Sequence, residues 1–176
     1  ILAVNGYLLH GVEVAARLMR FYPNGELFGH LIGYVGRINE RESQTIDRIK
    51  YSGTDSIGKI GIEKFYEPLL LGDVGNEQVE TNARGRVMRI LDNVDPVPGS
   101  HLTLYLDSQL QRIAHQAFKG DRGALVAIDV KTGGILAMVS APSYDPNLFV
   151  SGISQKDYDA LLNSPDRPLF DRSIRG

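Results

Sequence analysis

Apolar residues recur at different spacings along the chain, and each spacing predicts a different element. Apolar and polar positions alternate over 11–21, which predicts a half-buried strand. The spacing becomes helical over 27–35 and is clearest over 62–70, where apolar side chains recur at i, i+3, i+4, i+7 and i+8. Because proline lacks a backbone N–H, Pro68 disturbs the last turn of this second helix.

Polar residues predict where other elements begin and turn. A helix is expected over 39–48, because Asn39 and Glu42 have the spacing of a capping box. The segment 51–59 is rich in Gly, Ser and Thr and is expected to be a loop. Two alternating runs separated by a turn then predict a β-hairpin over 77–91.

The segment 95–100 is the best candidate for a linker. Pro96 and Pro98 stiffen it and disfavour both helix and strand. We therefore expect two domains, 1–98 and 99–176, with a bend and few contacts across the segment that joins them.

The second half has its own order of elements. The patterns predict a strand, a helix, a tight hairpin of two strands and a short helix, over 102–106, 108–118, 123–140 and 154–162. Ser108 and Gln111 have the spacing of a capping box, and Lys131–Gly134 supplies the hairpin turn. This order predicts an α+β fold, in which one helix covers an antiparallel sheet, rather than a parallel sheet.

The composition is that of an ordinary globular protein. Hydrophobic residues make up 43% and charged residues 23% of the 176 residues, enough for a buried core. The net charge of −2 gives no basic field for nucleic acid, and the absence of cysteine excludes disulfides and thiolate catalysis. No apolar run is long enough to span a bilayer and there is no signal peptide. Because the first residue is Ile1 rather than Met, a membrane anchor encoded upstream is compatible with the sequence.

The titratable residues give no metal or cofactor site. The histidines share no metal-ligand spacing, so we predict neither a metal nor a cofactor. His30 lies in an apolar segment and is expected to be a core or interface residue with a hydrogen-bond partner. Asp129 and Asp145 stand beside turns, where capping is the simplest role for a carboxylate.

Several stretches resemble, in the same order, motifs of the class B penicillin-binding proteins. In the first half these stretches are Arg20–Gly25, His30–Gly36, Gly58–Lys64 and Arg84–Arg86. In the second half they are Thr103–Asp107, Gly123–Asp129, Leu136–Ser140 and Pro142–Asn147. The resemblance is colinear over nearly the whole chain, and the run 144–150 favours the branch that serves cell elongation over the cell-division branch.

The resemblance implies an elongated pedestal module of strands and short helices, followed by the first part of a transpeptidase domain with an incomplete antiparallel sheet. It implies a protein of the bacterial inner membrane whose periplasmic D,D-transpeptidase cross-links peptidoglycan stem peptides and is acylated by β-lactams. The partners that it implies are a SEDS-type glycosyltransferase and a rod-shape scaffold protein.

The resemblance also implies that the nucleophilic serine lies in a Pro-Gly-Ser-x-x-Lys element beyond Gly176. We therefore predict no catalytic residue in this chain, which would serve as a scaffold and partner-docking module. An incomplete sheet leaves an apolar face or an open edge exposed, so we expect a dimer through 99–176 in a crystal.

Two short patterns mimic catalytic motifs. Ser56 and Lys59 form a literal S-x-x-K, and Lys131–Gly133 is a literal K-T-G, which leaves open a self-contained penicilloyl serine hydrolase that uses Ser56 and Lys131. S-x-x-K chemistry needs both side chains on one helix face, whereas Gly58 and its neighbouring glycines disfavour a helix there. No S-x-N motif occurs, so both patterns are interpreted as structural. A stand-alone peptidoglycan-binding module is a third possibility.

Charged and glycine residues of the pedestal-like motifs are predicted to form a structural network. An arginine can bind a carboxylate through two parallel hydrogen bonds, so the resemblance places Arg20, Glu63 and Arg84 together at the pedestal core. The alternative is that these are three solvated surface charges. The predicted network comprises Arg20, Gly33, Tyr34, Gly61, Glu63, Arg84 and Gly85.

Overall fold

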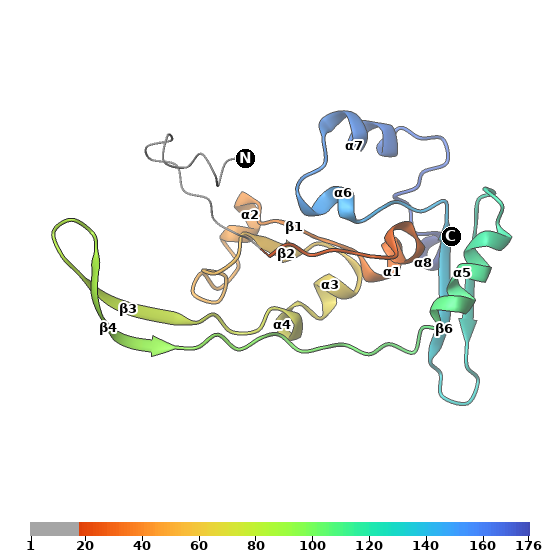
Figure 1. Ribbon diagram of the computed structural model, residues 1–176. Coiled ribbons are helices and arrows are strands. Elements are labelled where there is room, and N and C mark those ends of the chain that lie inside the picture. Colours follow the sequence, from red (N-terminus) through yellow and green to blue (C-terminus); the bar gives the residue numbers. More distant parts are fainter. Residues whose placement is uncertain (1–17) are drawn as a thin grey trace, which may run out of the picture.

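The chain folds as an α+β protein whose described part contains three two-stranded antiparallel sheets and short helices. This arrangement is seen in a computed structural model that describes residues 18–176 (Figure 1). Most of the strand predicted over 11–21 lies outside the described residues, and 18–20 form no regular element. No helix within 18–176 is long and apolar enough to cross a membrane.

The first half is built from short helices around a small sheet. In chain order its elements are η2 (Gly25–Phe28), α1 (Gly29–Ile32), β1 (Val35–Arg37), α2 (Glu40–Ser43), β2 (Ser56–Gly58), α3 (Gly61–Phe65) and α4 (Glu67–Leu70). β1 and β2 are antiparallel, with Gly36 opposite Ile57. β2 therefore occupies part of the segment that was predicted to be a loop.

Three predicted helices of this half differ from those observed. The helix expected over 27–35 ends at Ile32, because Gly33 has φ 76° and ψ −151° and turns the chain into β1. α2 has the predicted capping box between Asn39 and Glu42 but spans only 40–43. The helix expected over 62–70 is two helices, since Tyr66 leaves helical geometry and Pro68 lies in the first turn of α4, where no backbone N–H is needed.

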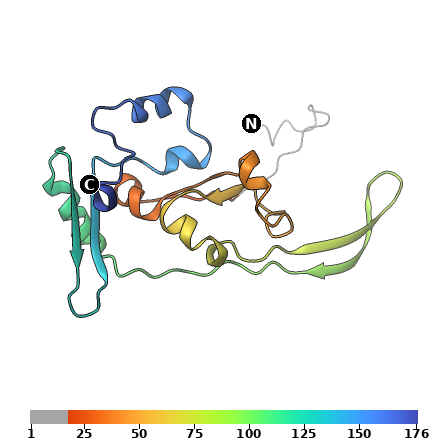
Figure 2. The ribbon, with the colours of Figure 1, turned by 180° about the vertical axis from the view of Figure 1, so that it is seen from behind.

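The predicted hairpin is present as β3 (Asn76–Thr81) and β4 (Val87–Val94). Its register shifts twice, and its apolar side chains Val87, Met88, Ile90 and Leu91 are at least half exposed. Figure 1 shows this ribbon reaching away from the rest of the molecule. It lies at the opposite end from the second half, as the view from behind also shows (Figure 2).

The segment 95–100 lies along the first half rather than standing free. Val97 forms an isolated antiparallel bridge with Asp73, and the Ser100 N–H donates to the Leu69 carbonyl at 2.7 Å. A side chain at Gly99 would overlap the Leu70 backbone. Its backbone therefore supplies a partner for the end of α4. The expectation of few contacts across the segment is also wrong, because Asn147 and Gln111 of the second half bond the main chain of the first half.

The second half contains α5 (Ser108–Ala117), β5 (Gly123–Ile128), β6 (Ile135–Ala141), α6 (Asn147–Val150), α7 (Gln155–Leu162) and α8 (Arg172–Arg175). The predicted hairpin of β5 and β6 is confirmed, with Gly133 at φ 72° in its turn. No strand forms over 102–106. The cap of α5 is Asp107, not Ser108, since the Asp107 carboxylate accepts from the N–H groups of Gln109 and Leu110.

The buried core lies where the two halves meet. Its apolar members come from the start of the first half, from α5 and β6, and from the segment that follows β6: Tyr22, Phe28, Ala114, Ala137, Val139, Ala141, Tyr144 and Phe149. Beyond this core, apolar side chains of the β5–β6 hairpin such as Val126 and Ile128 are exposed. An exposed apolar face was expected there, and the dimer through 99–176 stays a prediction.

Candidate functional site at the junction of the two halves

A buried carboxylate organises the first half. The Glu63 side chain on α3 is only 6% exposed, and its two oxygens face the Arg20 guanidinium at 2.8 Å (Nε to Oε1) and 3.1 Å (Nη2 to Oε2). This two-point geometry is the strong form of an Arg–carboxylate pair. The Tyr22 hydroxyl also donates to Glu63 Oε1 at 3.2 Å and accepts the Val35 N–H at 2.9 Å. Burial and the Glu63 charge raise the Tyr22 pKa, so its hydroxyl stays protonated.

Two glycines of the predicted network allow α1 and α3 to touch backbone to backbone. A Cβ at Gly33 would overlap the Ile60 carbonyl, and a Cβ at Gly61 would lie 2.6 Å from the Leu31 carbonyl oxygen. Both glycines have positive φ. Only a residue without a side chain combines this conformation with this approach.

Arg84 and Gly85 lie elsewhere. They form the turn of the β3–β4 hairpin, where Gly85 has φ 75° and open space around it and the Arg84 N–H donates to Asn82 Oδ1. Arg84 is exposed and has no contact with Glu63 among the described residues. Placing Arg84 and Gly85 in the network was therefore wrong, because the hairpin carries both away from α3 (Figure 1).

The aromatic contacts across the junction start from Tyr34. Its ring stacks on Phe149 of α6, with centroids 4.3 Å apart and planes at 21°. It also meets Tyr144 edge-on at 6.3 Å. Tyr34 thus joins β1 to the segment that follows β6.

Asn147 binds the main chain of Tyr22 at two points. The Tyr22 N–H donates to Asn147 Oδ1 at 2.9 Å, and Asn147 Nδ2 donates to the Tyr22 carbonyl at 2.9 Å. The amide thus supplies the donor and acceptor that a neighbouring strand would supply. Tyr144 adds a third polar contact, since its hydroxyl donates to the Gly29 carbonyl at 3.1 Å.

Gln111 uses the same geometry on β6. Its Oε1 accepts the Met138 N–H at 2.8 Å, and its Nε2 donates to the Met138 carbonyl at 2.7 Å and to the Leu27 carbonyl at 2.8 Å. Gln111 is 1% exposed. One side chain of α5 therefore holds both β6 and the first half.

Sequence reasoning missed Gln111 and Asn147 as junction residues. Gln111 was assigned to a local cap, and Asn147 was only part of a motif. Their partners are 84 and 125 residues away, so no local pattern indicates these bonds.

Replacing Gln111 by alanine is expected to lower the free energy of unfolding by about 2 kcal/mol. The change leaves three part-buried backbone groups, in Met138 and Leu27, without their side-chain partner. A fully buried group would cost about 1–3 kcal/mol, but water can reach part-buried groups, so the total stays at about 2 kcal/mol. Gln116→Ala is the matched control, because Gln116 is exposed on the same helix and its loss should cost under about 0.5 kcal/mol. Urea unfolding of both variants checks this, and equal losses would contradict the role of Gln111.

His30 is a histidine of the junction. Its ring meets Tyr144 edge-on at 5.1 Å, and its Nε2 is buried without a hydrogen-bond partner among the described residues. The expected partner is therefore not found for this nitrogen. Burial lowers the His30 pKa, and Arg172 adds to this. Asp171 and the Pro142 and Pro168 carbonyls oppose the shift but do not cancel it.

We expect the chain to lose stability as the pH falls below about 6.5, the ordinary histidine pKa. The lowered folded pKa means that the unfolded chain binds the proton more readily, so acid favours unfolding from 6.5 down to the folded value. His30→Phe keeps an aromatic ring against Tyr144 and should flatten the dependence, whereas His101→Phe, at an exposed position, should leave it in place. Urea midpoints between pH 5 and 7.5 measure this, and an unchanged slope in His30→Phe would refute it.

The two catalytic mimics have structural roles. Ser56 lies in β2 and bonds Asp55, and the Lys59 ammonium pairs with Glu42. Residues three apart in an extended segment point to opposite faces, so Ser56 and Lys59 do not form a nucleophile–base pair. Thr132 sits in the β5–β6 turn and donates to Asp129 at 2.7 Å.

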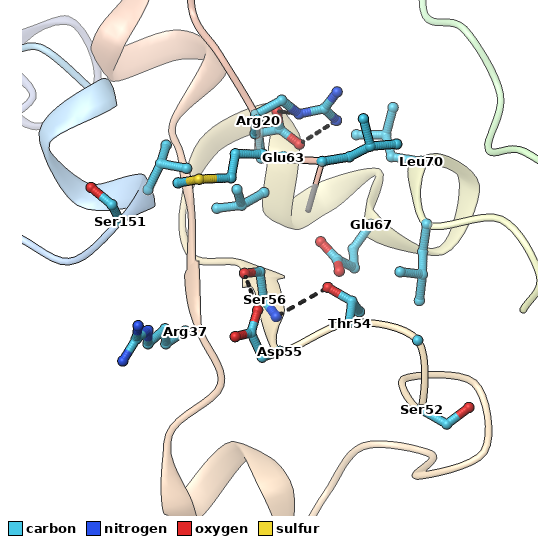
Figure 3. Close-up of a pocket in the computed structure, with 16 residues that line it drawn as sticks. Arg20, Arg37, Ser52, Thr54, Asp55, Ser56, Glu63, Glu67, Leu70 and Ser151 are labelled. Carbon is cyan, nitrogen blue, oxygen red and sulfur yellow. Dashed lines mark hydrogen bonds and ion pairs between the residues drawn. The ribbon is translucent and has the colours of Figure 1, made fainter. Parts of the chain in front are cut away.

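An open groove of about 1040 Å³ lies beside the Arg20–Glu63 pair, with Ser56 across from it (Figure 3). Its lining also includes Val150 and Ser151, at the end of α6. Glu67 borders the groove and accepts from the Gly58 N–H at 2.7 Å, and burial raises the Glu67 pKa. The groove thus has walls from both halves of the chain.

Comparison with known proteins finds two family matches in this chain. The profile of the penicillin-binding protein dimerisation domain matches residues 2–104, and that of the penicillin-binding protein transpeptidase domain matches 123–168. The chain belongs to the penicillin-binding protein family. It covers the pedestal and the start of the transpeptidase domain.

Relatives of this penicillin-binding protein chain are the peptidoglycan D,D-transpeptidases MrdA, which are PBP2 proteins. MrdA of Acinetobacter baumannii is 51% identical over 97% of the chain, and MrdA of Escherichia coli K12 is 48% identical over 99%. PBP2 of Pseudomonas aeruginosa, solved with WCK 5153, has a TM-score of 0.77 at 52% identity over 89% of the chain and 31% of its own. PBP2 of Helicobacter pylori, solved with MreC, has a TM-score of 0.79 at 38% identity over 88% of the chain and 28% of its own. The chain spans 25% and 28% of the lengths of the two MrdA proteins.

Proposed function

We propose that the chain is the pedestal and opening part of a peptidoglycan D,D-transpeptidase of cell elongation. In this proposal the parent enzyme cross-links peptidoglycan stem peptides, is acylated by β-lactams and is anchored in the inner membrane with these domains in the periplasm. The observation that carries the proposal is the match to two consecutive domains at about half identity to MrdA, in a chain whose halves share one buried core.

The role of the chain itself is mechanical. The pedestal, 1–98, holds the transpeptidase portion, 99–176, through hydrogen bonds of Asn147, Gln111 and Tyr144. These bonds join side chains of the second half to the main chain of the first. They fix the orientation of the catalytic domain that would follow.

A fluorescent-penicillin gel tests the enzymatic proposal. We expect no labelling of this chain, whose S-x-x-K and K-T-G patterns lie in a strand and a turn, and labelling of the parent protein that extends beyond Gly176. Ser56→Ala in the parent should label as well as the unsubstituted protein. Labelling of the short chain that Ser56→Ala abolishes would overturn the proposal in favour of a self-contained hydrolase.

We also propose that the pedestal docks a rod-shape scaffold protein of the MreC type and a SEDS-type glycosyltransferase. The PBP2 of Helicobacter pylori, which shares this fold at a TM-score of 0.79, was solved as a complex with MreC. Biolayer interferometry with the cognate MreC should give saturable binding to this chain. Binding to a 99–176 fragment alone, with none to the whole chain, would contradict docking on the pedestal.

A further inference from the structure

Tyr22 is held at both ends by different halves of the chain. Its hydroxyl is bound inside the pedestal, by Glu63 at 3.2 Å and by the Val35 N–H at 2.9 Å. Its main-chain N–H and carbonyl are bound by the amide of Asn147, each at 2.9 Å. Tyr22 is only 7% exposed, so water does not compete readily for these bonds.

Asn147 is itself fixed within the second half. Asp145 Oδ1 accepts from the Asn147 N–H at 2.9 Å and from Asn147 Nδ2 at 2.8 Å. Both amide protons of Asn147 are therefore used, and its oxygen is directed at the Tyr22 N–H. Because Asn147 is the first residue of α6, a shift of Tyr22 moves the start of that helix.

We propose that Tyr22 and Asn147 form a coupling unit, through which the state of the Arg20–Glu63 pair sets the position of α6 and so tunes the transpeptidase. This rests on the proposed function. The groove of Figure 3 is lined by Arg20 and Glu63 from the first half and by Val150 and Ser151 at the end of α6. A ligand or partner that displaces Arg20 from Glu63 would leave Tyr22 as the remaining donor to that carboxylate. Glu63 and the Tyr22 hydroxyl could then shift together, and the Asn147 bonds carry that shift to α6.

A double-mutant cycle in the parent protein tests the coupling. Tyr22→Phe removes only the hydroxyl, and Asn147→Ala removes the amide. Each should lower the rate of acylation by fluorescent penicillin by about 2- to 30-fold, the range that coupling energies of about 0.5–2 kcal/mol produce. The double variant should lose no more than the larger single loss, because both changes break one chain of contacts.

Tyr34→Phe is the matched control. Tyr34 lies in the same junction and packs on Phe149, but its hydroxyl does not bind Glu63. The fold-loss in acylation rate of the Tyr34→Phe, Asn147→Ala double variant should therefore equal the product of the two single fold-losses. If the fold-losses of Tyr22→Phe and Asn147→Ala also multiplied in their double variant, the two residues would act independently and the coupling unit would be overturned. Absence of labelling in the unsubstituted parent would instead overturn the proposed function.

Hydrogen exchange gives a readout that does not depend on activity. In this chain Tyr22→Phe should speed exchange of the Phe149 amide, which bonds the Pro146 carbonyl in α6, by about 3-fold or more. Exchange in α7 should not change, since its Ser154 cap lies outside the unit. If the Phe149 amide exchanged at the same rate in the unsubstituted chain and in Tyr22→Phe, the proposal would be refuted. This result would stand even if Asn147→Ala were too unstable for the kinetic cycle.

Discussion

Replacing Gly33 by alanine is expected to lower the free energy of unfolding by about 4 kcal/mol, or to prevent folding. The backbone of Gly33, at φ 76° and ψ −151°, lies in a region that other residues adopt only with about 1–3 kcal/mol of strain. The new methyl group would also overlap the Ile60 carbonyl, and such overpacking costs about 1–3 kcal/mol more. Gly61→Ala should behave in the same way, and urea unfolding measures both losses.

Gly85→Ala separates the two causes. Gly85 has φ 75°, close to that of Gly33, but nothing lies within 4 Å of the position of its Cβ. Its substitution should cost only about 1–2 kcal/mol, from the backbone conformation alone. If all three alanine variants lost the same stability, the close approach of α1 and α3 would not be what requires glycine.

Arg20→Met is expected to cost about 3 kcal/mol. It leaves the Glu63 carboxylate, 6% exposed, with Tyr22 as its remaining hydrogen-bond donor. Breaking a fully buried ion pair costs about 3–5 kcal/mol, and the value here is at the low end because the Arg20 side chain is 43% exposed. The thermal or urea midpoint of the variant gives the loss directly.

Two arginine variants serve as controls for this result. Arg20→Lys keeps the charge but loses the two-point geometry, so its loss should be about half as large. Arg84→Met removes an exposed arginine of the hairpin turn and should change stability by under about 0.5 kcal/mol. A loss for Arg84→Met as large as that for Arg20→Met would mean that both arginines support the pedestal core.

Features with a local cause were predictable from the sequence. The turn at Lys131–Gly134 follows from its glycines, and the capping box of Asn39 and Glu42 needs only a spacing of three residues. The pairing of Arg20 with Glu63 came from a resemblance between motifs, which carries information about distant parts of the chain. The same resemblance misplaced Arg84, because a motif does not reveal how far a hairpin extends.

Features with a distant cause were not predictable. Tyr34 and Val35 have helical spacing, yet β1 forms because it pairs with β2 and because Tyr34 stacks on Phe149. The buried amides of Gln111 and Asn147 likewise depend on partners that only the folded chain brings near. The junction, which is the candidate site, is therefore the part that sequence patterns describe least.

The junction also has a consequence for how the chain acquires its structure. The bonds from Asn147 to Tyr22 and from Tyr144 to Gly29 close loops of 125 and 115 residues. Contacts of such high sequence separation form late and slowly, because the chain entropy is lost before the contact is gained. During synthesis the segment 20–30 is made early, but it cannot form its bonds with Tyr144 and Asn147 until those residues have been made. Over that interval the apolar residues of this segment lack the partners that bury them in the folded chain, which favours wrong contacts. The segment 20–30 is therefore among the last described parts of the pedestal to reach its final contacts.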